Sequence, residues 1–363
     1  MPPSLAIAGR QIGREHEPYV ICELSGNHNG SLDRALHLLD AAAATGADAI
    51  KIQSYTADTI TIDHDGPGFT IEGGLWHGRT LYDLYKEAQT PFEWHEALFV
   101  RARELGVTLF SSPFDESAVD LLEGLGAPAY KIASFETVDL PLIAYVASKR
   151  KPMIISTGMS NLSEINDAVR TARENGCEEL ILLHCVSSYP APDEDSNLRT
   201  IPHLAEAFNC VAGLSDHTSG SAVSVASVAL GGAVIEKHFT LARSDGGPDA
   251  AFSLEPAEFS ALVTDCRRAW HALGEVGYDL CGSEQGNKVF RRSLYVVADV
   301  AEGDVLTKDN IRSIRPGYGL APKHLPVITG RRAARSLRRG EPLTWNLIMD
   351  HTERTTPERN IVR

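Results

Sequence analysis

Residues 211–239 read VAGLSDHTSGSAVSVASVALGGAVIEKHF, and this stretch decides the fold. It holds two apolar runs typical of buried strands, and a helical spacing of apolar residues separates them. His217 and His238 each follow the end of one run. Parallel strands joined by a crossover helix would place the two imidazoles side by side, as a metal pair requires. The alternative is two hydrogen-bonded core histidines, but the polar residues before them, Asp216 and Lys237, favour a metal site at strand ends.

Similar apolar runs recur along the first 240 residues, and helical patterns lie between most of them. Examples of the helical patterns are LDRALHLLDAAAATG and SEINDAVRTARENG. Eight alternating strand–helix units predict an α/β fold of the (β/α)8 TIM-barrel type, and the GxGxxG turn of an open doubly wound sheet is missing from the sequence. The eight runs are YVICEL, ADAIKIQ, VTLFSS, PAYKIAS, PMIIST, ELILLHC, CVAGLSD and AVIEKHF.

The pattern changes beyond the barrel and also once within it. We predict a barrel domain over residues 1–275, a linker over 276–290 that is rich in Gly, Glu and Asn, and a small β-rich domain over 291–355. Within the barrel, residues 59–94 are too long and too aromatic for an ordinary βα loop. We predict that this segment, called the lid segment below, is partly helical and covers the barrel mouth.

Composition narrows the class of protein. The chain has 363 residues, 43% of them hydrophobic, and a formal net charge of −14, which disfavours binding to nucleic acid or to an anionic membrane surface. Six scattered cysteines without a CxxC pair suggest reduced thiols. Neither a signal peptide nor an apolar stretch of bilayer length is evident, so we expect a cytoplasmic enzyme for small molecules.

Polar side chains end nearly every predicted strand, which is where barrel enzymes place their chemistry. Lys51 and Lys131 are the most informative, because a buried lysine needs an anionic partner. The partner could be an internal carboxylate, Glu23 or Glu136, but several small hydroxyl groups nearby favour a bound phosphate. These hydroxyl groups belong to Ser112, Ser134, Ser156 and Ser215.

A Schiff-base lysine, as in class I aldolases, is the competing chemistry. Two such lysines are present rather than one, and His217 and His238 could hold a divalent metal that polarises a carbonyl without an imine. We therefore expect metal-dependent chemistry with Mn²⁺, or with Mg²⁺ or Co²⁺.

Ten strings of the sequence together resemble the sialic acid synthases over essentially the whole chain. The resemblance implies a phosphoenolpyruvate-dependent condensing enzyme that has a TIM barrel and a C-terminal SAF (antifreeze-like) domain. It also implies a divalent metal, usually manganese, held by His217 and His238, and a domain-swapped homodimer. The strings are ELSGNHNG (23–30), DAIKIQSY (48–55), SSPFDESAVDLL (111–122), YKIASFE (130–136), STGM (156–159), HCVSSYPAP (184–192), GLSDHTSG (213–220), IEKHFTL (235–241), GPD (247–249) and RPGYGLAP (315–322).

The resemblance also implies roles for single residues. Glu23 and Glu136 would handle protons, and Gln53 would orient a metal-bound water. The sugar would contact Tyr189, Asp249 and, from the partner subunit, the SAF-domain arginine that corresponds to Arg315. The phosphoenolpyruvate ligands would be Lys51, Ser112, Lys131, Ser134, Ser156, Ser215 and Ser187, the last standing where the family has asparagine.

Two departures point to one branch of the family. Ala250, Ala251 and Phe252 follow GPD, where synthases for N-acetylneuraminate typically carry histidine, and the lid string GLWHGRTLYDLYKEAQTPFEWH resembles the pseudaminic acid synthases. That branch condenses phosphoenolpyruvate with 2,4-diacetamido-2,4,6-trideoxy-L-altrose, whose methyl groups would suit an apolar wall that includes Phe252. An N-acetylneuraminate or legionaminate synthase is the alternative within the same chemistry, and a non-catalytic sugar-binding protein is the alternative of another class.

Overall fold

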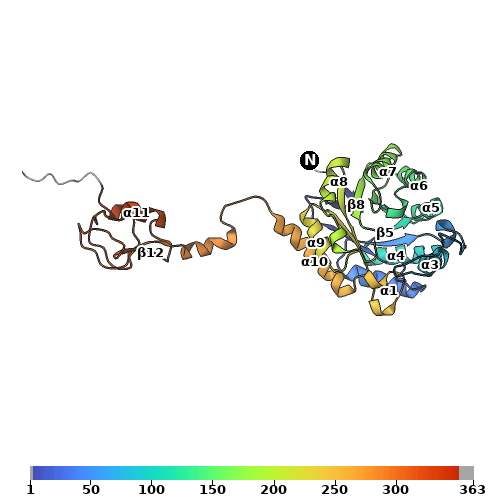
Figure 1. Cartoon of the computed structure of the whole chain (residues 1–363), viewed down its shortest axis with the longest axis horizontal. Coiled ribbons are helices and arrows are strands. Elements are labelled where there is room, and N and C mark those ends of the chain that lie inside the picture. Colours follow the sequence, from blue (N-terminus) through green and yellow to red (C-terminus); the bar gives the residue numbers. More distant parts are fainter. Residues whose placement is uncertain (1–2, 351–363) are drawn as a thin grey trace, which may run out of the picture. The chain divides into compact units, whose positions relative to one another are not determined.

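The computed structural model describes residues 3–350. The chain divides into two compact units between Gly274 and Glu275, and each unit is described here by itself. In the first unit, helices surround a central ring of strands (Figure 1). None of the helices within residues 3–350 combines the length and the apolar composition needed to cross a bilayer.

The central sheet is a closed barrel of eight parallel strands, in which the last strand, β10, pairs with the first, β3. This confirms the TIM-barrel prediction, and each predicted apolar run overlaps one strand, although β4 and β5 extend one residue beyond their runs. The strands are β3 (Tyr19–Glu23), β4 (Ala49–Ser54), β5 (Thr108–Pro113), β6 (Tyr130–Ile132), β7 (Met153–Ser156), β8 (Leu180–Cys185), β9 (Val211–Asp216) and β10 (Val234–His238).

The helices of the barrel begin and end at local sequence signals. Asn161 caps the N-terminus of α7 with its side chain, and Glu164 completes a capping box. Gly106 ends α4 in the left-handed conformation that favours glycine. The barrel helices are α1 (Leu32–Ala44), α4 (His95–Leu105), α5 (Glu116–Gly124), α6 (Leu140–Ser148), α7 (Leu162–Glu174), α8 (Thr200–Phe208), α9 (Ala222–Ala229) and α10 (Pro256–Leu273).

A short hairpin that the sequence did not indicate precedes the barrel. It pairs β1 (Ser4–Ile7) with β2 (Arg10–Gly13), and Ile7 and Ile12 join a core cluster with the barrel residues Phe110 and Ile181. A second, larger cluster fills the space between the strands and the helices. With apolar side chains packed inside the barrel, the polar chemistry is left to the carboxyl ends of the strands.

The lid segment lies between β4 and α4 and is partly helical. It begins within α2 (Ala57–Ile60) and contains α3 (Leu81–Ala88) and a 3-10 turn, η1 (Phe92–Trp94). Backbone hydrogen bonds join residues 69–71 to 78–81. The Trp76 indole N–H donates to the Pro248 carbonyl oxygen at 2.9 Å. The segment is therefore tied to the loop that follows β10.

The second unit has a small apolar core of its own, which includes Leu294, Leu306 and Leu343. Within residues 275–350, two strands form its antiparallel sheet, and isolated bridges lie beside them. Residues 282–290 of the predicted linker form a 3-10 helix, and residues 351–355 of the predicted second domain lie outside the described residues. The elements are η6 (Gly282–Phe290), β11 (Ser293–Val296), β12 (Ile311–Ile314), η7 (Pro322–His324), α11 (Leu325–Ile328) and η8 (Trp345–Leu347).

Candidate active site

Two buried lysines and two buried glutamates meet at the carboxyl end of the barrel. The Lys51 Nζ lies 3.2 Å from the Glu23 Oε2 and 3.0 Å from the Glu236 Oε1. The Lys131 Nζ lies 4.0 Å from the same Glu236 oxygen and donates to its neighbour's carbonyl, the Ile132 oxygen, at 2.9 Å. Glu236 is thus shared by both lysines, whereas sequence analysis considered Glu23 and Glu136 as their carboxylate partners.

The pKa values of the two lysines differ because their neighbours differ. Burial alone would lower the pKa of Lys51, but Glu23 and Glu236 offset this and raise it above its usual value. Burial lowers the pKa of Lys131 to about 8, with Glu236 opposing the shift. Lys51 is therefore a fully charged, paired lysine, and Lys131 is the lysine that an additional anion would stabilise.

Small hydroxyl groups lie at or just after the ends of neighbouring barrel strands, as expected for a phosphate site. The Ser112 and Ser156 hydroxyls are buried without a hydrogen-bond partner in the described residues. A methyl group at Gly158 would lie 2.3 Å from the Ser187 Oγ and 2.8 Å from the Ser134 Oγ, so both hydroxyls approach this glycine. Unpartnered buried donors are costly, and phosphate oxygens would satisfy several of them at once.

Ser215, also predicted as a phosphoenolpyruvate ligand, makes a different contact. Its hydroxyl donates to the Glu236 Oε1 at 3.1 Å. In this arrangement Ser215 orients the glutamate that both lysines share, and its predicted contact with the substrate stays a prediction.

The two predicted metal ligands lie side by side at the ends of β9 and β10. Their ring centroids are 5.3 Å apart. The His217 Nδ1 lies 2.9 Å from the Val186 carbonyl oxygen, which directs the other ring nitrogen away from the backbone, and the buried His238 Nδ1 has no partner in the described residues. Burial and the neighbouring His217 lower the pKa of His238 well below its usual value. Burial would lower the pKa of His217 as well, but the neighbouring Cys185 thiol offsets this and raises it. A neutral imidazole is the form that binds a metal, so the pair fits a divalent cation whose binding releases any proton that His217 carries.

The two histidines have few candidate metal ligands beside them among the described residues. Within residues 3–350, no three His, Cys, Asp or Glu side chains gather as a metal cluster. A cation at the histidine pair would therefore need water or substrate as further ligands, which is the open type of site that catalysis uses.

A second buried ion pair is formed by the residues that directly precede the two histidines. The Lys237 Nζ is 2.8 Å from the Asp216 Oδ2 and donates to the Thr218 carbonyl oxygen at 2.7 Å. The Asp216 Oδ1 accepts from the backbone N–H and the hydroxyl of Thr218, at 2.8 and 2.7 Å. Both charged residues thereby fix the backbone that follows His217.

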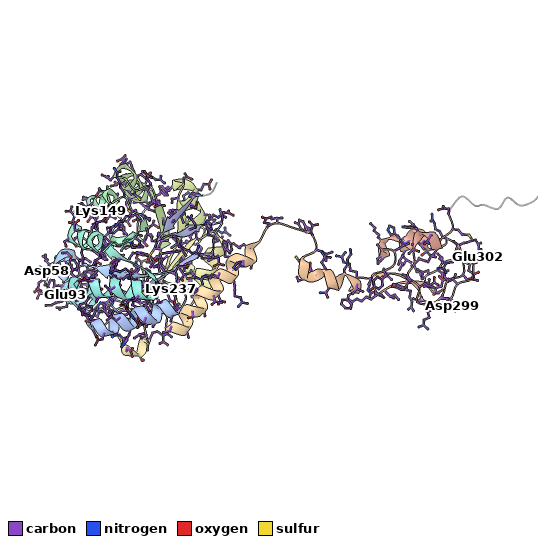
Figure 2. The ribbon with its side chains drawn as sticks, turned by 180° about the vertical axis from the view of Figure 1, so that it is seen from behind. Asp58, Glu93, Lys149, Lys237, Asp299 and Glu302 are labelled. Atoms are coloured by element: carbon purple, nitrogen blue, oxygen red, sulfur yellow. The ribbon has the colours of Figure 1, made fainter. Side chains whose placement is uncertain are left out.

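We expect Lys237→Met to destabilise the protein by about 3–5 kcal/mol, because it leaves the Asp216 charge buried and unpaired. Lys149→Met is the matched control, since the Lys149–Asp120 pair, at 2.9 Å, lies at the surface and should matter little. Figure 2 labels both lysines: Lys237 lies within the barrel unit and Lys149 at its edge. Urea unfolding measures both changes, and equal losses would contradict the buried-pair account.

Aromatic rings gather beside the histidine pair. The Tyr189 ring lies 4.5 Å from that of His217 and 5.2 Å from that of Phe252, and Phe252 lies 4.9 Å from His238, between centroids. The lid residue Trp76 reaches Tyr189 at 5.7 Å. Together with buried Ala250, these rings form an apolar wall next to the histidine pair.

A chain of hydrogen bonds leads from Glu23 to Asp249. The Gln53 Nε2 donates to the Glu23 Oε1 at 2.9 Å and to the Ser25 Oγ at 3.2 Å. Ser25 in turn donates to Asp249. The predicted residues Glu23, Gln53 and Asp249 are thus connected through Ser25, a residue that sequence analysis missed.

Two further predicted residues stand apart from these contacts. The Glu136 Oε2 is buried without a hydrogen-bond partner in the described residues, and burial raises the pKa of this carboxyl to about 7, with Lys131 opposing. Arg315 belongs to the second unit, where it follows β12. Its predicted contact with the sugar stays a prediction.

A TIM barrel whose mouth holds buried lysines, serine hydroxyls and two adjacent imidazoles is typical of an enzyme that acts on a small anionic substrate. The chain belongs to the NeuB family: the model of that family matches residues 38–278, and a SAF domain follows at residues 291–349. The resemblance to the sialic acid synthases is thereby confirmed, as is the order of a barrel followed by a SAF domain.

Curated relatives and solved structures agree with this membership. The pseudaminic acid synthase of Campylobacter jejuni (strain 81-176) is 43% identical over 336 residues, which cover 92% of this chain and 98% of that protein. The N,N'-diacetyllegionaminic acid synthase of Legionella pneumophila is 36% identical over 335 residues, covering 91% and 94%. The structure of N-acetylneuraminic acid synthetase from Leptospira borgpetersenii in complex with citrate gives a TM-score of 0.71 at 32% identity, covering 79% and 95%. The prediction of a synthase is confirmed at the level of the family.

Proposed function

We propose that this chain condenses phosphoenolpyruvate with 2,4-diacetamido-2,4,6-trideoxy-L-altrose and water to give pseudaminic acid and phosphate. The observation that carries the choice of sugar is the higher identity to the Campylobacter pseudaminic acid synthase than to the legionaminic acid synthase. The apolar wall that contains Phe252 supports the same choice. An N-acetylneuraminate or legionaminate synthase is the alternative, and product analysis with a panel of sugars tests between them.

Phosphoenolpyruvate binds, in this proposal, with its charged groups between Lys131, Lys51 and the serine hydroxyls. Lys131 is the better placed cation, because its Nζ comes no closer than 4.0 Å to the shared Glu236 carboxylate and its pKa is depressed. One pair of unit charges at about 4 Å is worth only ~4 kcal/mol at an effective dielectric constant of 20, before desolvation, so a multiply charged anion benefits from two cations. Ser112 and Ser156 supply hydroxyl donors that otherwise lack a partner.

Bond making and breaking follow from the two substrates. C3 of the enolpyruvate attacks the aldehyde carbon of the open-chain sugar, and the aldehyde oxygen takes up a proton. Water adds at C2 and loses a proton. The bond between C2 and the phosphate oxygen then breaks as the new C2 hydroxyl passes its proton to the departing phosphate, which leaves the 2-keto acid.

His217 and His238 would hold the divalent cation of this reaction, Mn²⁺ first and Mg²⁺ or Co²⁺ as alternatives. When bound, the cation supplies Lewis acidity toward the sugar aldehyde. The protein itself keeps His238 neutral by burial and holds His217 through the Val186 carbonyl oxygen. Gln53, which donates to Glu23, would orient the water near this pair.

Glu136 is the proton donor that we favour for the aldehyde oxygen. Its carboxyl faces Lys131 on β6, Asp139 at the start of α6 and Tyr85 on α3, and its pKa near 7 keeps a substantial protonated fraction at neutral pH. Glu23 is engaged by Lys51 and Gln53 instead, so it serves mainly to neutralise and orient them.

The raised pKa of Glu136 predicts a dependence of stability on pH. The folded-state value of about 7 exceeds the ordinary 4.5, so the stabilising contribution of the protonated group is complete below pH 4.5 and is lost as pH rises through 7. Between pH 5 and 8, the wild-type free energy of unfolding should therefore fall more steeply than that of Glu136→Gln. Urea unfolding at several pH values measures both slopes, and parallel curves would contradict this assignment.

We also infer a homodimer in which the second unit of one chain caps the barrel mouth of its partner. Residues 1–274 carry 19 Lys and Arg against 37 Asp and Glu, whereas the remaining residues carry 15 against 11, so the two units attract each other. The segments that follow β6 and β7, up to the first residue of α7, expose apolar side chains that a cap would cover. They are Phe135, Val138, Met159 and Leu162, each more than half exposed. The predicted cytoplasmic location stays a prediction.

A further inference from the structure

Ser25 holds a backbone conformation that favours glycine. Its φ of 47° lies in the left-handed region, at the first corner of a tight turn in which the Asn27 N–H donates to the Leu24 carbonyl oxygen at 3.2 Å. The next residue, Gly26, cannot carry a side chain, because a methyl group there would lie 2.9 Å from Ala88 at the end of α3. A side chain kept at position 25 in this conformation needs a compensating contact.

The Ser25 side chain makes that contact inside the site. The residue is only 3% exposed, and its hydroxyl accepts from the Gln53 Nε2 at 3.2 Å and donates to the Asp249 Oδ2. One hydroxyl group thereby connects three elements: the turn after β3, the end of β4 and the loop after β10. The same Asp249 oxygen lies 4.0 Å from the His238 Nδ1.

The geometry points to Ser25 as a positioning residue for the acetamido sugar, acting through Asp249 and Gln53. The inference rests on the proposed function, in which Asp249 contacts the sugar. Ser25 fixes one carboxylate oxygen of Asp249 by a hydrogen bond and leaves the second oxygen to accept from a sugar hydroxyl or amide. It also fixes the amide of Gln53 between two acceptors, so that the polar side of the sugar pocket is organised before the sugar binds.

Ser25→Gly tests this role with little risk to folding, because glycine suits the backbone while the hydroxyl group is lost. We expect the KM for the altrose sugar to rise by about tenfold or more, as for loss of a hydrogen bond to a charged group. The dissociation constant of phosphoenolpyruvate, measured by calorimetry without sugar, should stay within about twofold, since Ser25 contacts neither lysine. The melting temperature should be unchanged or higher. Ser25→Ala should raise the KM equally while straining the backbone.

Ala8→Gly is the matched control. Ala8 has a φ of 48° and is exposed in the β1–β2 hairpin, so this change relaxes the same kind of backbone conformation outside the site and should leave both kinetic constants unchanged. Asp249→Asn distinguishes the contact of Asp249 with the sugar from the positioning of Asp249 by Ser25. In that background Ser25→Gly should add less than about threefold, because the two residues act as a unit.

Each outcome decides a different point. An unchanged sugar KM in Asp249→Asn would overturn the sugar assignment of this end of the site, and the inference with it. A raised KM in Asp249→Asn with a normal KM in Ser25→Gly would overturn only the role of Ser25. Equal changes in the sugar KM and in phosphoenolpyruvate binding would show a general structural effect, which would also overturn it.

Discussion

Replacing His217 or His238 with alanine is expected to lower kcat/KM by about 10³-fold or more. A divalent cation at a developing charge is worth several kcal/mol, and each 1.36 kcal/mol is a factor of ten in rate. Treatment with a chelator should have the same effect on the unaltered enzyme, and Mn²⁺ should restore activity to the chelated enzyme but not to either variant. Phosphate release from phosphoenolpyruvate in the presence of sugar is the measurement.

The control for this experiment is His37→Ala, because His37 is an exposed residue of α1. It should keep full activity and the same response to chelation and Mn²⁺. Calorimetry with Mn²⁺ alone provides a second readout: binding should be lost in His217→Ala and kept in His37→Ala. Undiminished turnover in either site variant would contradict the metal assignment.

Mixing two inactive variants is expected to regenerate activity. Lys131→Met removes a cation of the anion end, and Arg315→Ala removes the contact predicted to come from the partner subunit, so each homodimer should be inactive or nearly so. A heterodimer has one mouth that carries both changes and one that carries neither. Random exchange should therefore restore about a quarter of the wild-type activity, since half of the dimers are mixed and each has one intact site.

Lys131 is chosen for this mixture because its nearest carboxylate is 4.0 Å away, whereas Lys51 holds two buried glutamates at 3.2 and 3.0 Å. Loss of Lys51 would leave those carboxylates unpaired and endanger folding. Subunit exchange is followed with differently tagged chains. Tagged heterodimers that form without any return of activity would exclude the proposed contribution from the partner.

The eight strands could be predicted because each is a short apolar run that ends in polar residues, and their parallel order follows from the helices between them. The β1–β2 hairpin could not, since its strands, Ser4–Ile7 and Arg10–Gly13, are each only four residues long, and Ile7 and Ile12 are recognised as core residues only once the barrel interior exists. Local pattern predicts long-range packing poorly in such short elements.

The candidate site was predictable where it depends on strand ends. Lys51, His217 and His238 lie there because strand register alone places them. The sharing of Glu236 by both lysines was missed, although its position two residues before His238 puts both side chains on the same face of β10. That alternation was an available signal.

Contacts that depend on loop conformation had no such signal. Ser25 meets Asp249 only because the turn after β3 adopts a left-handed conformation and the loop after β10 folds back over it. The contact between Trp76 and the Pro248 carbonyl oxygen likewise joins segments that are 172 residues apart. The sequence indicated an aromatic lid segment, but not which of its aromatic side chains contacts the site.

Product formation from a panel of sugars tests the proposed reaction and the choice of sugar most directly. The purified chain would receive phosphoenolpyruvate, Mn²⁺ and either 2,4-diacetamido-2,4,6-trideoxy-L-altrose or N-acetylmannosamine, with the nonulosonic acid detected by mass and phosphate release measured in parallel. The account predicts a kcat/KM at least about tenfold higher for the altrose, because hydroxyls placed against the Phe252 wall lose water contacts worth roughly 1 to 3 kcal/mol each. Equal turnover of the two sugars would contradict the choice of sugar, and the absence of any condensation product would contradict the reaction.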